Sequence, residues 1–219
     1  MVRMTSAAAA SAGTVLVAGT ITFWLYDFGA HSRHMALHIV SMNVAAPLLA
    51  AGLVVQWRRP IATPPAALWV ATVVQIVLLW AWHAPAVYDF AMKSHAAQFA
   101  MHGLLFAAAM AFWLALLTIG PSSRWQTLPA LLLTGKLACL LAALLIFAPR
   151  TLYDAAGHLA HAVDRLSGLS HLDDQHLAGV LMITACPLSY LVAAVMIAVQ
   201  LVRPEAQDPL AAQSLSLRR

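Results

Sequence analysis

Six long apolar segments constrain this chain more than any other feature of its sequence. A helix needs about 20 mostly apolar residues to cross the hydrocarbon core of a bilayer. Hydrophobic residues make up 62% of the chain and charged residues only 9%, whereas soluble domains are about one quarter charged. The sequence therefore predicts an all-α integral membrane bundle of about six transmembrane helices, forming one domain over residues 1–219. The expected spans are 8–28, 34–56, 66–84, 96–118, 127–148 and 176–202.

The distribution of positive charge predicts the orientation of these spans. With an even number of spans, both termini lie on one side, and that side carries seven of the twelve Lys and Arg residues against four on the other. The twelfth, Lys136, falls within the fifth span, where ionisable residues are rare. The excess of basic residues places both termini in the cytoplasm, as in a multi-pass protein of a bacterial inner membrane.

Several function classes lack support in the sequence. No run of Lys or Arg indicates contact with nucleic acid, so the lipid bilayer is the expected surrounding. The chain has no phosphate-binding loop, nucleophile elbow or His-Glu-x-x-His motif. We therefore expect a protein that is not an enzyme, and the sequence does not indicate its oligomeric state.

The ten histidines are distributed unevenly across the expected membrane. In the predicted orientation, eight of them fall in outer loops or at the outer ends of spans. The other two, His38 and His102, lie one or two turns deeper. This asymmetry predicts that the chemistry of the protein takes place at the periplasmic face.

The second span carries a ladder of possible metal ligands, His34, His38 and Met42. Residues four apart in a helix lie on one face, about 6 Å apart along the axis. Imidazole together with thioether favours a soft monovalent cation such as Cu(I) over Mg²⁺ or Ca²⁺. The same imidazoles could bind the edge of a haem or form hydrogen bonds between helices.

Two further spans bring histidines to the same outer layer. His83 ends the third span and could complete a site with the second span, with Asp89 orienting its ring and Tyr88 nearby. Alternatively, His83 and Tyr88 are simply interfacial residues of the headgroup region. In the fourth span, His95 and His102 are two turns apart on one face, and His102 should reach the depth of His38.

The last span adds acidic and sulfur-containing side chains. Ser170 and Asp173 have the spacing of a capping box, and Asp174 follows at a helix N-terminus, where the helix dipole favours anions. Met182 and Cys186 are four residues apart on one face and within reach of the same outer layer. Their sulfur atoms suit copper, although Met and Cys also fill apolar cores.

Four segments, in their order along the chain, resemble the multi-spanning CtaG family of cytochrome c oxidase assembly factors. They are His34–Met42 with Ala46-Pro47, Trp82–Asp89, His102–Trp113 and Asp174–Met182. The resemblance implies a role in maturing haem-copper oxidase, with oxidase subunits as partners and a part in supplying copper. The positions that match are His34, His38, Met42, His83, Tyr88, Asp89, His102, Asp174 and Met182.

The leading hypothesis is a copper-handling assembly factor that holds Cu(I) near the outer leaflet through His34, His38, Met42 and His102. His83 and Met182 are further candidate ligands, while Tyr88, Asp89, His95, Asp174 and Cys186 are expected in supporting positions. One alternative is a membrane electron carrier with b-type haem between His38 and His102. A second is a copper permease, which would need soft ligands continuing to the cytoplasmic side, where the sequence has few.

Overall fold

The computed structural model describes residues 29–57, 62–153 and 168–202. Within this part of the chain the long elements are all helical, and five helical segments are long and apolar enough to cross a membrane. The prediction of an all-α membrane bundle is thereby confirmed. The expected first span, 8–28, lies outside the described residues.

The described spans begin and end close to their expected bounds. The elements are α2 (Ala30–Ile39), η1 (Val40–Ala45), α3 (Ala46–Gln56), α4 (Pro65–Trp82), α5 (Pro85–Met92), α6 (His95–Thr118), η2 (Pro121–Gln126), α7 (Thr127–Phe147) and α9 (His171–Val202). The helix α9 begins five residues earlier than expected because the predicted capping box starts it. The backbone N–H of Asp173 donates to Ser170 Oγ over 3.1 Å, and Ser170 Oγ donates to Asp173 Oδ2 over 2.6 Å.

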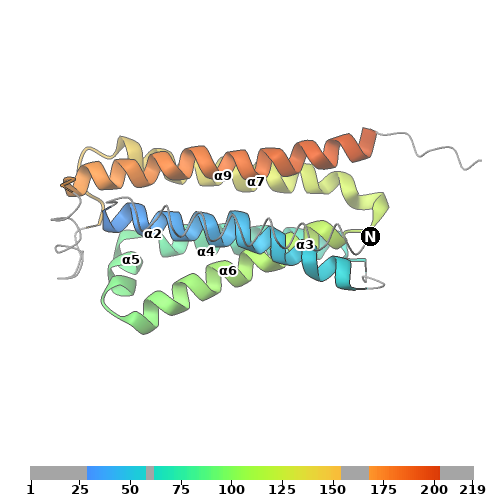
Figure 1. The fold of residues 1–219 in the computed structure, drawn as a ribbon, viewed down its shortest axis with the longest axis horizontal. Helices are drawn as coiled ribbons and strands as arrows, with labels where there is room; N and C mark the ends of the chain where they lie inside the picture. The colour runs from blue at the N-terminus through green and yellow to red at the C-terminus, as the bar shows by residue number, and fades with distance from the viewer. Residues whose placement is uncertain (1–28, 58–61, 154–167, 203–219) are drawn as a thin grey trace, which may run out of the picture.

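The spans form two packed groups that meet along α2 (Figure 1). The helices α7 and α9 lie side by side, and α9 also packs against α2, while α6 packs against α3 and α4. At Gly179 the contact between α7 and α9 is close, because a Cβ atom there would lie 2.7 Å from Ile146 Cγ1 and 3.1 Å from the carbonyl oxygen of Ala142. The short helix α5 lies at the end of the bundle where α2 and α9 begin.

A π-helical turn interrupts the first described span at η1. Here the backbone N–H of Ala46 donates to the carbonyl of Ser41, five residues earlier. The next residue, Pro47, has no N–H, so the carbonyl of Met42 lacks its helical donor. The indole Nε1–H of Trp113, on α6, donates to this carbonyl over 3.1 Å. The wide turn thus accommodates the proline and ties α6 to the first span, satisfying a polar group that lipid could not.

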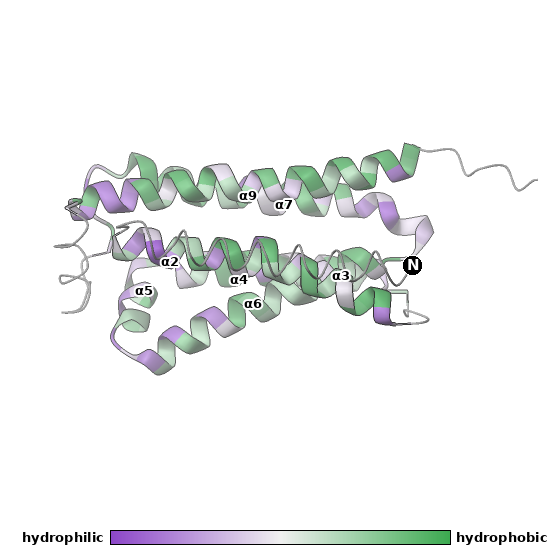
Figure 2. Cartoon of the chain, viewed as in Figure 1, coloured by the Kyte–Doolittle hydropathy of each residue, from purple (hydrophilic) through white to green (hydrophobic). Residues whose placement is uncertain are grey.

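Apolar side chains cover the outside of the bundle, and hydrophilic residues gather towards the ends of the helices (Figure 2). Large exposed residues include Val70 and Val77 on α4 and Leu188 and Val195 on α9. Such a surface suits contact with lipid acyl chains. Lys136, near the middle of α7, is also exposed.

The close contact at Gly179 can be tested by adding a side chain. Gly179→Leu should lower the free energy of unfolding by about 1–3 kcal/mol, because α9 must move away from α7 to fit the new atoms. Thermal unfolding in detergent would measure the change. Gly52→Leu is the matched control, since a Cβ atom at Gly52 meets nothing within 4 Å. Equal effects of the two substitutions would contradict the interpretation.

Candidate metal site

Three histidines from two helices form a compact group, the histidine triad, consisting of His34, His38 and His102. One ring nitrogen from each lies within 4.8 Å of the other two. His34 Nε2 and His38 Nε2 share a hydrogen bond of 2.8 Å. The ring of His102 stacks on that of His38 with 4.7 Å between centroids and contacts His34 edge-on at 5.0 Å. The expected match in depth between His38 and His102 is therefore what the structure shows.

Backbone carbonyls fix the protonation of two rings in this region. The Nδ1–H of His102 donates to the carbonyl of Gln98 over 2.8 Å, and the Nδ1–H of His83 donates to the carbonyl of Leu79 over 2.6 Å. A carbonyl oxygen can only accept, so a neutral ring in either place carries its lone pair on Nε2. Both Nε2 atoms are buried and have no hydrogen-bond partner among the described residues. A histidine that ligates a metal has this same arrangement.

His83 lies beside the triad as a fourth imidazole. Its ring centroid lies 5.8 Å from that of His38. It is buried, and the Leu79 carbonyl holds its Nδ1 proton. Together, the four rings form the histidine cluster.

Two tyrosines form a wall on the side of the cluster nearer the end of the bundle. The Tyr88 hydroxyl lies 3.1 Å from His31 Nδ1, and the Tyr88 ring meets His34 edge-on at 5.2 Å. The ring of Tyr153 lies 4.2 Å from that of Tyr88, and its hydroxyl donates to the carbonyl of His83 over 3.0 Å. Burial raises the pKa of Tyr88 above its ordinary value, so the phenol stays protonated and neutral.

The carboxylate of Asp174 holds the start of α2 in place. Its Oδ2 accepts from the backbone N–H of His31 over 2.7 Å, and its Oδ1 accepts from the backbone N–H of Ser32 over 3.1 Å. The hydroxyl of Ser32 also donates to Oδ1. A Cβ atom on Gly29 would collide with this carboxylate, so glycine permits the close approach. Asp174, which lies on α9, thus caps a different helix from its own and sets the position of the histidines on α2.

The neighbouring Gln175 fixes the segment that carries Tyr153. Its Oε1 accepts from the backbone N–H of Leu152 over 2.7 Å, and its Nε2 donates to the carbonyl of Leu145 over 3.2 Å. Because both the oxygen and the NH2 group of this side-chain amide form hydrogen bonds, the chain after α7 is held against α9. Asp174 and Gln175 therefore position two parts of the site from one turn of α9.

The other residues expected to act with the triad lie in different places. Met42, Met182 and Cys186 line a cavity that His38 also lines. His95 is exposed at the start of α6, so it does not join His102. The expectation that Asp89 orients His83 is wrong, because the Leu79 carbonyl takes the Nδ1 proton.

Two residues that contact the cluster or its tyrosine wall, His31 and Tyr153, were missed by reasoning from the sequence. His31 precedes His34 by three residues and therefore lies on the same helical face, which is a signal that could have been used. Tyr153 lies just after the fifth span, and no local pattern marks it. The hydrogen bond from Leu152 to Gln175 and that from the Tyr153 hydroxyl to the His83 carbonyl hold it beside the cluster.

The histidine cluster offers neutral nitrogen ligands only. The metal-ligand grouping in the described part of the chain contains the three triad histidines and no carboxylate. The nearby Asp174 carboxylate is occupied by donors from α2. The cluster therefore lacks the oxygen ligands that hard cations such as Mg²⁺ and Ca²⁺ prefer.

Comparison with known proteins gives one match. Residues 2–204 match the family of cytochrome c oxidase caa3 assembly factors. No curated protein and no solved structure matches the chain.

The contribution of Asp174 can be separated from that of its neighbour. Asp174→Ala should lower the free energy of unfolding by about 2–3 kcal/mol, because the first backbone N–H groups of α2 lose their acceptors in a buried place. Asp173→Ala removes only half of an exposed capping box and should cost about 1 kcal/mol or less. Thermal unfolding of both variants in detergent would measure the difference, and a smaller loss for Asp174→Ala would contradict this role.

Proposed function

We propose that this chain, which belongs to the family of cytochrome c oxidase caa3 assembly factors, binds Cu(I) as cargo in its histidine cluster and supplies it to the oxidase. The family supports a role in oxidase assembly within the membrane and oxidase subunits as partners. One observation carries the copper assignment. His83 and His102 both have their Nδ1 protons engaged by carbonyls and their buried Nε2 atoms left without a partner.

The chemistry of the cluster favours a transition metal such as copper. Imidazole suits copper, and the absence of a carboxylate from the triad disfavours hard ions such as Mg²⁺ and Ca²⁺. Such a protein would act as a carrier without catalysing a reaction.

The geometry of the triad suits reversible binding. Two nitrogens bound to one ion at about 2.0 Å stand roughly 3.3–4 Å apart, which is farther than the 2.8 Å between His34 Nε2 and His38 Nε2. An ion must therefore replace the hydrogen bond between these two rings and separate them. When the ion leaves, the hydrogen bond forms again, which compensates part of the lost coordination and favours release.

The position of the cluster suits exchange at the outer face of a bacterial inner membrane. It lies towards the end of the bundle where α2, α5 and α9 meet, and the sequence assigns this end to the periplasmic side. His34 and His38 are buried, and the free Nε2 of His102 is buried as well, although the residue as a whole is only partly so.

The alternative of a b-type haem between His38 and His102 fits the geometry less well. Haem ligands point their nitrogens at each other across the iron, but these two rings stack face to face at 4.7 Å with 8° between their planes. A Soret absorption band in purified protein would nevertheless support the haem carrier. A copper permease would instead transport copper into vesicles that contain the purified protein.

Cu(I) binding by the purified protein in detergent tests the proposal directly. His102→Ala should weaken Cu(I) binding by about 100-fold or more, since loss even of a group that supports a ligand typically costs 10–100-fold. Competition with a water-soluble Cu(I) chelator would measure the affinity. His95→Ala is the matched control, because this histidine lies on the same helix and is exposed. Wild-type protein that binds no Cu(I), or equal losses in both variants, would overturn the assignment.

A second test places the same variants in cells that depend on this chain for oxidase assembly. His38→Ala should reduce copper-dependent oxidase activity severalfold, and added copper should restore part of it, because excess metal compensates for weak binding. His95→Ala should leave the activity unchanged. Normal activity with His38→Ala at low copper would contradict a role of the triad in supplying copper.

A further inference from the structure

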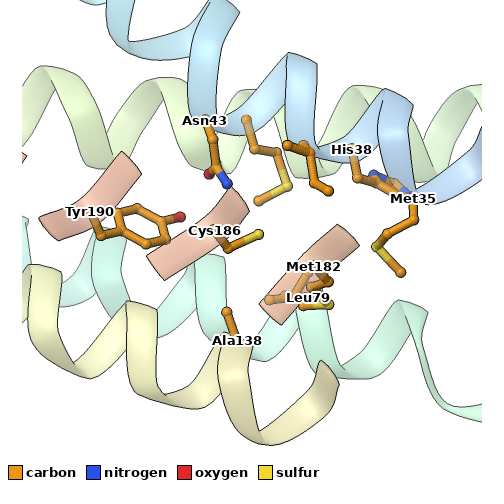
Figure 3. A pocket seen from close by; sticks show the side chains of 10 residues that line it. Met35, His38, Asn43, Leu79, Ala138, Met182, Cys186 and Tyr190 are labelled. Atoms are coloured by element: carbon orange, nitrogen blue, oxygen red, sulfur yellow. The ribbon is translucent and has the colours of Figure 1, made fainter. Parts of the chain in front are cut away.

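A small cavity is lined by His38 and not by His34. Its volume of about 20 Å³ is room for one or two occupants the size of a water molecule. Four sulfur-bearing side chains line it, namely Met35, Met42, Met182 and Cys186. We call this space the sulfur cavity. In Figure 3, His38 and Met35 lie at one end, Tyr190 at the other and Cys186 between them.

The sulfur atoms of this cavity come from two spans. Met35 and Met42 lie on α2 and η1, whereas Met182 and Cys186 lie on α9. All four side chains are buried. Methionine often fills irregular gaps in apolar cores, but here three thioethers and a thiol surround space that they leave open. Thioether and thiol sulfur are ligands that select Cu(I) among biological cations.

His38 connects the sulfur cavity with the histidine triad. Its Nε2 shares the hydrogen bond with His34 Nε2, and the residue also lines the cavity. Its second nitrogen, Nδ1, is buried and has no hydrogen-bond partner among the described residues. When His38 donates its Nε2 proton to His34, the lone pair lies on Nδ1. A buried lone pair without a donor is costly unless a ligand occupies it.

The far end of the cavity is closed by polar side chains. Tyr190 lines this end, and its hydroxyl accepts a hydrogen bond of 3.0 Å from Gln75 Nε2. Both residues are buried, and Gln75 is almost completely so. The sulfur-bearing side chains of the cavity therefore lie between His38 at one end and the hydrogen-bonded Tyr190 at the other.

We propose that the sulfur cavity is a second, inner binding position for Cu(I), reached from the histidine triad through His38. This inference rests on the proposed function and extends it. One ion occupies either the triad or the inner position, because both use His38. In the inner position, Nδ1 of His38 and the thioethers of Met42 and Met182 are its ligands.

The exchange between the two positions needs no electron and no co-reactant. Copper remains Cu(I) throughout, imidazole nitrogens of the triad leave the ion, and thioether sulfurs replace them. His38 keeps one proton throughout. It lies on Nδ1 while Nε2 binds the ion in the triad, and it moves to Nε2, where it is donated to His34, when Nδ1 binds the ion in the inner position. Because the inner position is shielded from water, an ion there is protected from chelators outside the bundle.

X-ray absorption at the copper edge tests the inner position. Full-length protein in detergent with one equivalent of Cu(I) should show both nitrogen and sulfur neighbours, and Met42→Leu/Met182→Leu should show nitrogen alone. These exchanges nearly conserve volume, so the fold should persist. Met101→Leu is the matched control, because Met101 is fully buried on α6 and does not line the cavity.

The rate of copper release provides a second readout. A water-soluble chelator should remove Cu(I) from the double variant about tenfold faster than from wild type or Met101→Leu. A wild-type spectrum with nitrogen neighbours only, together with unchanged release, would overturn the inner position and leave copper binding by the triad intact. Wild-type protein that binds no Cu(I) at all would overturn the proposed function and the inner position together.

Discussion

The buried carboxylate of Asp174 joins the two packed groups of helices at the end where the histidines lie. A carboxylate with 1% exposure is costly unless strong donors surround it, and the start of α2 supplies two backbone N–H groups and the hydroxyl of Ser32. The positive end of the helix dipole adds to this stabilisation. Because α9 in turn packs along α7, this one contact sets the height and rotation of α2 relative to the rest of the bundle. The positions of His34 and His38 depend on it.

The need to satisfy every backbone polar group in lipid explains a second feature. Pro47 has no N–H, so one carbonyl of the preceding turn is left unpaired in any helical register. With the π turn at η1, the unpaired carbonyl is that of Met42, and the indole of Trp113 donates to it. Met42, which lies in this turn, lines the sulfur cavity together with His38.

Carbonyls of the preceding turn hold two rings of the histidine cluster. The bonds from His83 to Leu79 and from His102 to Gln98 engage the Nδ1 protons and leave the buried Nε2 atoms without a partner among the described residues. The phenol rings of Tyr88 and Tyr153 lie beside the cluster. In the proposed function, the imidazole nitrogens are the ligands of the ion, and selectivity arises from the type of ligand more than from a rigid cage.

Hydropathy predicted the bounds of the described spans closely, because a span must be long and apolar. Helical spacing correctly predicted that His38 and His102 lie at the same depth. Local patterns also predicted the capping box at Ser170. Tertiary structure decided which faces meet. It assigned Asp174 to another helix, left His95 exposed, brought Tyr153 to the cluster and placed Met182 and Cys186 beside a cavity that His38 also lines. Periodicity specifies the face and the depth of a residue within its own helix. Which helix packs against that face depends on packing and hydrogen bonds between segments far apart in the chain. The sequence pattern of one helix does not indicate these contacts.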